Sequence, residues 1–241
     1  MDRKTPLLLL ITGMFLAVGI AVSGYFIGQT VYNGKTAINT AEAKGLAVRK
    51  VKANQGSWSL SFSVYSNTKA EVPLLYKKAE ALQDKITRIL VSKGFAQEEI
   101  ISDIIDYNYS ENRDKDNKLL SKIYTLTSGV NLKTNKVELI EPARKELNKL
   151  IAEGLSIRNH EPRYTFSKLN DIKPQMLQEA TKNARVAAAE FANNAGVKVG
   201  GIRSARQGSF YIRDDGAEYS DDRKIEKTVR VVTTISFYLT E

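Results

Sequence analysis

The chain contains one histidine and no cysteine, which narrows the chemistry open to it. Without cysteine it can form no disulfide, no thiolate zinc site and no thiolate nucleophile. The histidine, His160, stands before Glu161 and Pro162, and no pattern of serine and aspartate near it indicates a catalytic triad. We therefore predict that His160 is a loop residue, that the protein is not an enzyme, and that it has no catalytic residue.

Acidic residues gather in the segment 213–227, RDDGAEYSDDRKIEK, where carboxylates could collect a hard cation such as Ca²⁺. The aspartates concerned are Asp214, Asp215, Asp221 and Asp222. Their spacing lacks the EF-hand pattern, and Arg213, Arg223 and Lys224 compete for the carboxylates. The shorter run 114–117, DKDN, has no glycine or distal glutamate at the needed positions. We predict solvated loops at both places and no metal site.

Three glycines, Gly196, Gly200 and Gly201, follow a predicted helix. A phosphate-binding loop instead needs its glycines between a strand and the N-terminus of a helix, where backbone N–H groups converge. We therefore predict the end of a helix and a turn at these glycines, and no nucleotide or other cofactor.

Basic residues dominate the charge, and the net charge is +9. Six of them fall on predicted strands: Arg49, Lys50, Lys52, Arg203, Arg206 and Arg213. Alternate residues of a strand share a face. Nucleic-acid binding would require aromatic side chains interleaved with these residues, so we expect no nucleic-acid partner. A basic face toward anionic lipid is one interpretation, and an ordinary solvated or subunit-facing surface is the other.

The N-terminal segment is apolar from Leu7 to Ile27. As a helix this part spans about 31 Å, close to the ~30 Å hydrocarbon core of a bilayer. We predict that residues 1–32 form a retained membrane anchor with its N-terminus inside, and that residues 33–43 form a polar linker. A cleaved signal peptide is the alternative, because Ala21-Val22-Ser23 offers small residues at a cleavage site.

Hydrophobic periodicity predicts strands and three main helices behind the anchor. The predicted strands are 46–51, 58–65, 101–109, 123–132, 163–169, 202–212 and 228–239. In strand 58–65 four apolar residues, from Trp58 to Val64, alternate with serines, so one face is apolar and the other is hydroxylated. Charged loops at 110–118 and 213–227 join two hairpins. This order predicts an α+β fold with mostly antiparallel sheets and three main helices packed on them.

The predicted helices end at Gly94, Gly154 and Gly196, and their starts rest on local signals. The first follows a capping box, Thr68–Glu71, unless it begins at Pro73. The second opens at Asn135, although Pro142 interrupts its pattern. The third has Pro174 in its first turn.

The terminal strand is long, β-branched and apolar on one face, with Val232 and Tyr238 on the other. At a sheet edge such a strand must be covered or paired, and self-association would do that. The alternative is an interior strand of its own sheet.

Several segments together resemble the SIMPL-domain family of bacterial envelope proteins. They are LNDIKPQMLQEATKNARVAAAEFANNAG, VGGIRSARQGSF and KTVRVVTTISFYL, with the earlier GLAVRKVKANQGSWSLSFSV. The resemblance covers about residues 44 to 240 and predicts one SIMPL-like α+β domain over 44–241. It implies a periplasmic or membrane-associated protein, ring-like oligomers in some members and a loose link to envelope stress. It offers no catalytic residue to carry over.

These observations predict a non-enzymatic, membrane-anchored envelope scaffold that self-assembles. The expected location is the inner membrane, crossed once, with the C-terminal domain in the periplasm; a cleaved signal would leave a soluble periplasmic protein. The expected partners are copies of the same chain, the membrane and an anionic lipid surface. A binding module for a small ligand, lipid or partner protein is the second function considered.

Overall fold

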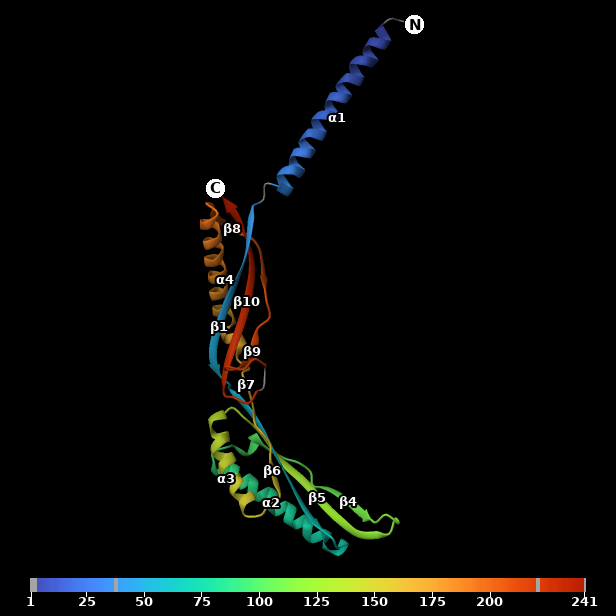
Figure 1. Cartoon of the computed structure of the whole chain (residues 1–241), viewed down its shortest axis with the longest axis vertical. Coiled ribbons are helices and arrows are strands. Elements are labelled where there is room, and N and C mark those ends of the chain that lie inside the picture. The colour runs from blue at the N-terminus through green and yellow to red at the C-terminus, as the bar shows by residue number, and fades with distance from the viewer. Residues whose placement is uncertain (1–3, 37–38, 220–221, 241) are drawn as a thin grey trace. The chain divides into compact units, whose positions relative to one another are not determined.

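The computed structural model describes residues 4–36, 39–219 and 222–240. Its described part is α+β with antiparallel sheets, which confirms the predicted fold class (Figure 1). The chain divides into two compact units. The first comprises Met1–Ala47, Leu177–Ser209 and Val231–Glu241, and the second comprises Val48–Met176 and Phe210–Arg230.

The apolar N-terminal segment forms one long helix, α1 (Lys4–Thr36). Its stretch Ile11–Tyr32 has a mean hydropathy of 1.8 and none of it is buried, so it is long and apolar enough to cross a membrane. Strand β1 (Thr40–Lys52) begins soon after it. The predicted linker 33–43 is therefore mostly the end of α1 and the start of β1, and residues 37 and 38 lie outside the described part. The strand begins earlier than the predicted residue 46. Its first buried residue is Ala43, which packs with residues of α4.

The first unit is a sheet with the order β1-β10-β8, covered by helix α4 (Figure 1). Its other elements are α4 (Leu169–Asn194), β8 (Lys198–Gln207) and β10 (Glu226–Thr240). Because β10 lies between β1 and β8, the terminal strand is an interior strand of its own sheet, which was one of the two interpretations left open, and the edges are β1 and β8. Val231, Ile235 and Phe237 of β10 are all buried, so the predicted apolar face of this strand lies against the core.

Helix α4 presents a face of alanines to the sheet. Ala180, Ala184 and Ala188 are fully buried, and Ala184 and Ala188 pack with Phe237 of β10. A methyl group is the largest side chain that keeps a helix backbone this close to a strand. At Gly45 the backbones of β1 and α4 come closer still, because a Cβ placed on this residue would lie 1.8 Å from the Ala180 carbonyl oxygen.

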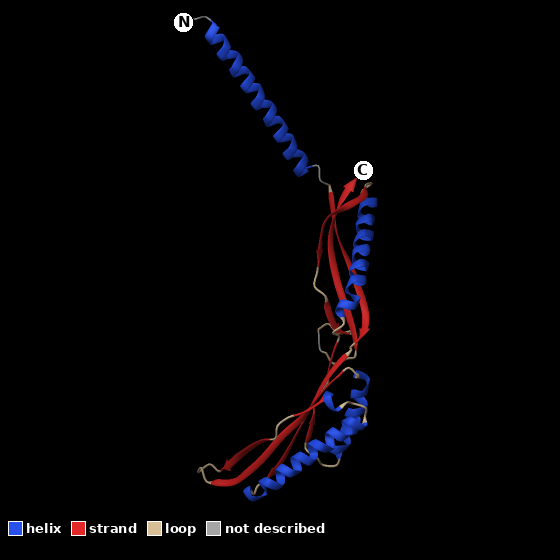
Figure 2. Ribbon diagram, turned by 180° about the vertical axis from the view of Figure 1, so that it is seen from behind, coloured by secondary structure: helices blue, strands red, loops and turns tan. Residues whose placement is uncertain are grey.

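The second unit is built on strands β2 and β5, which pair antiparallel along their length. Two helices lie on one face of this sheet and leave the other face without a helix (Figure 2). The elements are β2 (Gln55–Ser66), α2 (Val72–Ser92), β3 (Ile100–Ser102), β4 (Asp106–Arg113), β5 (Leu119–Thr134), α3 (Ile140–Ala152), β6 (Ile157–Asn159), β7 (Arg163–Thr165) and β9 (Tyr211–Asp214). Short 3₁₀ turns, η1 (Lys69–Glu71), η2 (Gln97–Glu99) and η3 (Val137–Leu139), precede α2, β3 and α3.

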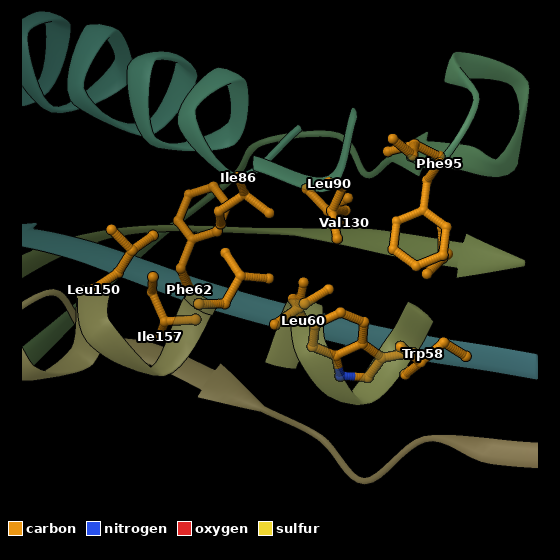
Figure 3. Packing of buried hydrophobic residues seen from close by; sticks show 14 of the residues in the cluster. Trp58, Leu60, Phe62, Ile86, Leu90, Phe95, Val130, Leu150 and Ile157 are labelled. Atoms are coloured by element: carbon orange, nitrogen blue, oxygen red, sulfur yellow. The ribbon is translucent and has the colours of Figure 1, made fainter. Parts of the chain in front are cut away.

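The core of the second unit follows the alternation predicted for β2. Trp58, Leu60 and Phe62 point into the core and belong to one buried cluster with Ile86 and Leu90 of α2 (Figure 3). The serines between them lie on the opposite, helix-free face, because successive side chains of a strand point to opposite faces.

Several predicted boundaries are wrong, mostly where charged residues suggested loops. The strand predicted at 101–109 is two strands, β3 and β4, and β4 continues to Arg113 inside the predicted loop. Every residue of β4 is exposed, so this strand accepts charged residues, and charge alone does not end a strand. The predicted strand 202–212 is likewise divided into β8 and β9, and β8 starts at Lys198.

The helix starts also differ from the predictions. Helix α2 begins at Val72 with Pro73 in its first turn, which confirms the alternative start, and Thr68 makes no side-chain cap. Instead, Ser66 Oγ donates to Glu71 Oε2 at 2.6 Å. Helix α4 begins at Leu169, so Pro174 lies inside it and costs one backbone hydrogen bond.

Candidate functional site

A polar cavity of about 740 Å³ opens on the second unit, beside β2 and β7. We call it the Arg163 cavity. Its lining residues are Ser57, Ser59, His160, Glu161, Pro162, Arg163, Asp222 and Arg223. Charged and hydroxyl-bearing side chains make up most of the lining, and Pro162 is its one apolar residue. Such a cavity suits a polar ligand.

The buried tryptophan of β2 positions the histidine. Trp58 Nε1 donates to Asn159 Oδ1 at 2.9 Å and to the His160 carbonyl oxygen at 3.0 Å. The His160 N–H donates in turn to the Ser59 carbonyl oxygen at 3.2 Å. On the helix-free face His160 Nε2 lies 3.1 Å from Ser61 Oγ. His160 thus lies between β6 and β7, as the predicted loop residue, in a fixed backbone geometry.

Strand pairing places an arginine in the cavity. In the antiparallel pair of β2 and β7, Ser57 lies directly opposite Arg163, so both side chains point to the same face. Among the described residues the Arg163 guanidinium has no hydrogen-bond or ion-pair partner. The next residue, Tyr164, is buried, and its N–H donates to the Asp222 carbonyl oxygen at 2.7 Å, which holds that side of the cavity.

A buried ion pair holds the backbone on the same side of the cavity. Lys227 Nζ and Asp214 Oδ1 form a short salt bridge, with side chains only 1% and 2% exposed. Asp214 Oδ2 accepts from the backbone N–H groups of Arg223 at 2.8 Å and Lys224 at 3.2 Å. Lys227 Nζ also lies 3.4 Å from Asp222 Oδ1. One buried carboxylate therefore fixes the backbone that carries the cavity residues.

The pKa of Asp214 reflects two opposing effects. Burial raises it, because a charged carboxylate is costly away from water. The hydrogen bond from Lys227 and those from the Arg223 and Lys224 backbones lower it and outweigh the burial. The pKa therefore lies below its ordinary value, and Asp214 is ionised at neutral pH.

The acidic segment does not gather into a cation site in the described part of the chain. Asp214 is engaged by Lys227, and Asp215 accepts from Lys50 Nζ at 2.7 Å and from Thr228 Oγ1 at 2.8 Å. Asp221 lies outside the described residues. Within the ranges described, no group of three or more His, Asp or Glu residues could hold a metal ion. The absence of a metal site remains a prediction.

The shorter acidic run closes a turn. Asp114 Oδ1 accepts from the backbone N–H groups of Asp116 at 3.0 Å and Lys118 at 2.8 Å. Asn117, at φ 62°, completes the turn between β4 and β5. In the described structure, the role of this acidic run is to close the turn.

The three glycines have two different roles. Gly196 ends α4 at φ 71°, as predicted, in the left-handed region that favours glycine. Gly200 and Gly201 lie inside β8, so the prediction of a turn there is wrong.

The six basic strand residues do not form one free face. Lys50 and Lys52 are paired with Asp215 and Glu138, at 2.7 and 2.9 Å. Arg49 donates to Gln175 Oε1 at 2.8 Å, and Arg213 donates to the Glu218 carbonyl oxygen at 2.6 Å. These four belong to the second unit, and the other two, Arg203 and Arg206, lie exposed on β8 in the first.

Sequence reasoning missed the contact between Ser61 and His160. The serine face of β2 was visible, but the strand pairing that brings residue 160 beside it was not. This pair has no carboxylate hydrogen-bonded to the imidazole among the described residues, and a serine–histidine pair without an orienting acid is an incomplete triad. The absence of enzymatic activity stays a prediction.

An antiparallel α+β domain behind one long apolar helix is the class of protein that these features define. A model of the SIMPL family, described as a protein of unknown function (DUF541), matches residues 42–237. The chain therefore belongs to the SIMPL family. A SIMPL domain of unknown function fits a non-catalytic binding or scaffold role. No curated protein matches the chain.

Solved structures offer only weak similarity. The de novo designed protein Foldit4 is 11% identical with a TM-score of 0.25, over 47% of this chain and 98% of that one. A hydantoinase/carbamoylase family amidase from Burkholderia ambifaria is 13% identical with a TM-score of 0.24, over 54% of this chain and 34% of the amidase. An uncharacterized conserved protein from Listeria innocua is 10% identical with a TM-score of 0.22, over 76% and 90%. Alignments at these TM-scores establish no shared function.

Proposed function

We propose that this chain is a non-enzymatic scaffold protein of the cell envelope, anchored in a membrane by α1 and self-associating through the sheet of its first unit. The free edge of β8 carries this proposal. Family membership and the exposed apolar helix support the setting, because a helix with no buried residue between Ile11 and Tyr32 needs an apolar environment. A role in envelope stress follows from the same family resemblance.

Strand β8 has an open edge in the described structure. It pairs with β10 on one side, and its residues 201–207 are all exposed. An unpaired edge offers a row of N–H and C=O groups to another strand. Because β1 is the opposite edge of the same sheet, β8 of one copy can meet β1 of the next. Such a head-to-tail contact closes into a ring where the rotation permits it.

Strand β8 carries two exposed arginines, Arg203 and Arg206. Charge does not select the partner strand, because β1 is also basic, with Lys44, Arg49, Lys50 and Lys52 beside a single Glu42. The same arginines are available to anionic lipid headgroups, which attract basic residues close to the surface.

Sedimentation velocity of the full chain in detergent micelles tests the assembly. We expect a species larger than one chain, and we expect the variant Ile202→Glu/Ala205→Glu to shift it toward single chains, since both residues lie exposed on β8. The matched control is Leu120→Glu, an exposed apolar residue of the second unit, which should leave assembly unchanged. A strictly single-chain wild type at high concentration would disprove self-association.

The second candidate function is a binding module for a small polar ligand. The Arg163 cavity favours it specifically, because its volume lies within the usual range of about 300–1,000 Å³ for ligand sites and its charged lining is fixed by buried contacts.

A further inference from the structure

The chemistry of the Arg163 cavity defines a class of ligand. We infer that the cavity binds a sugar acid, with the ligand carboxylate against the Arg163 guanidinium and the ligand hydroxyls against Ser57, Ser59 and His160. This inference rests on the second candidate function, ligand binding, and is independent of self-association.

The formal charges of the lining balance, because Arg163 and Arg223 stand against Glu161 and Asp222, but only three of these four side chains have a charged partner in the described structure. Glu161 Oε2 lies 3.3 Å from Arg223 Nε, and Asp222 Oδ1 lies 3.4 Å from the buried Lys227 Nζ. Each lining carboxylate therefore has a cation beside it. Arg163 has no such partner among the described residues, so its guanidinium is the lining cation that is open to a ligand anion. A ligand carboxylate complements this guanidinium.

The form of that charge favours a carboxylate. A guanidinium is planar and presents parallel N–H donors that match the two oxygens of a carboxylate. Because Ser57 lies directly opposite Arg163 across the β2–β7 pair, a carboxylate on the arginine also comes within reach of that hydroxyl. A cavity of about 740 Å³ is much larger than a bare carboxylate requires, so the ligand carries a body of its own.

The remaining lining residues favour a ligand rich in hydroxyl groups. The Ser57 hydroxyl makes no hydrogen bond among the described residues, and Ser59 Oγ donates to Asn131 Oδ1 at 2.7 Å, which leaves its lone pairs free to accept. His160 engages Ser61 through Nε2 and retains Nδ1 for a ligand. With Pro162 as the one apolar lining residue, the cavity offers no pocket for an apolar peptide side chain or an acyl chain. A sugar ring, polar at every edge, satisfies these groups.

Calorimetric titration of the full chain in a detergent without a sugar headgroup tests the assignment. The probes are digalacturonate, its neutral counterpart galactobiose, acetate and triglycine. We expect saturable binding of digalacturonate and at least tenfold weaker binding of the other three, because each lacks either the carboxylate or the hydroxyls. Equal or tighter binding of triglycine would overturn the sugar assignment, and equal binding of acetate would show that the site takes a carboxylate alone.

Two variants locate the binding. Arg163→Gln should weaken the binding of digalacturonate at least about tenfold, as expected for the loss of a charged hydrogen-bond donor. Arg158→Gln is the matched control, because Arg158 is another exposed arginine of the same sheet, lies opposite Ser61 and is not part of the cavity lining. Unchanged binding in Arg163→Gln, or an equal loss in both variants, would overturn the site.

The two proposals can fail separately. Both variants should keep the thermal unfolding midpoint and the sedimentation of the wild type, since the two arginines are exposed and β8 belongs to the first unit. Loss of ligand binding with assembly intact would concern the cavity, and loss of assembly with binding intact would concern β8.

Discussion

Replacing Gly45 by alanine is expected to destabilise the first unit by about 3 kcal/mol or more, which exceeds the usual cost of an added methyl group in a packed core. A Cβ at residue 45 would lie 1.8 Å from the Ala180 carbonyl oxygen and 2.4 Å from the Ala184 nitrogen. Both are backbone atoms of α4, so no side chain can rotate away. The helix must move off the sheet, and the packing of its buried alanines against Phe237 is lost.

Urea unfolding of the full chain in micelles, followed by circular dichroism, measures this loss. Amide exchange locates it, with protection falling in α4. The matched control is Gly201→Ala, because no atom lies within 4 Å of a Cβ at residue 201 and its stability should change by less than about 0.5 kcal/mol. If Gly45→Ala unfolds at the same urea concentration as the wild type, the close approach of β1 to α4 is wrong.

Replacing Lys227 by methionine is expected to cost about 3–5 kcal/mol, because it leaves the Asp214 carboxylate buried without its counter-ion. The two side chains are 1% and 2% exposed, so water cannot substitute for the lost partner. The Asp214 carboxylate also holds the backbone of Arg223 and Lys224, so the wall of the Arg163 cavity should loosen with it.

The neighbouring pair provides the control. Lys50 and Asp215 lie 2.7 Å apart, but their side chains are 76% and 32% exposed, and Lys50→Met should cost at most about 1 kcal/mol. The double variant Asp214→Asn/Lys227→Met should recover part of the loss, since it removes both buried charges. Equal costs for Lys227→Met and Lys50→Met in urea unfolding would contradict the burial of the pair.

Acid should reduce the cost of Lys227→Met. The pKa of Asp214 is lowered in the folded protein, so its contribution to stability is full well above the unfolded pKa of about 3.9 and is lost as the pH falls through the folded value. In Lys227→Met the Asp214 carboxylate is still buried, but it has lost the hydrogen bond from Lys227 that offset the cost of burying its charge. Protonation of Asp214 removes that charge and its cost. The difference in unfolding free energy between wild type and Lys227→Met should therefore shrink from pH 7 to pH 3. A difference that grows toward acid would refute this account.

The sequence by itself determined the local patterns of this protein. Alternation from Trp58 to Phe62 gives a half-buried strand whatever its partners are, and the alanines of α4 require a close neighbour. The apolar run of α1 and the glycine that ends α4 are similarly local signals, because each depends on residues within a few turns. The α+β class followed from the order of such elements.

Only the tertiary structure decided which strands meet. The pattern of β10 is the same for an edge and for an interior strand, so its place between β1 and β8 depended on pairing across long chain separations. Charge was an equally ambiguous sign of exposure. Asp214 stands in an acidic segment that resembles a loop, and yet its side chain is buried against Lys227. The Arg163 cavity, too, exists because strand register sets Ser57 opposite Arg163, and register is a property of two segments that neither shows alone.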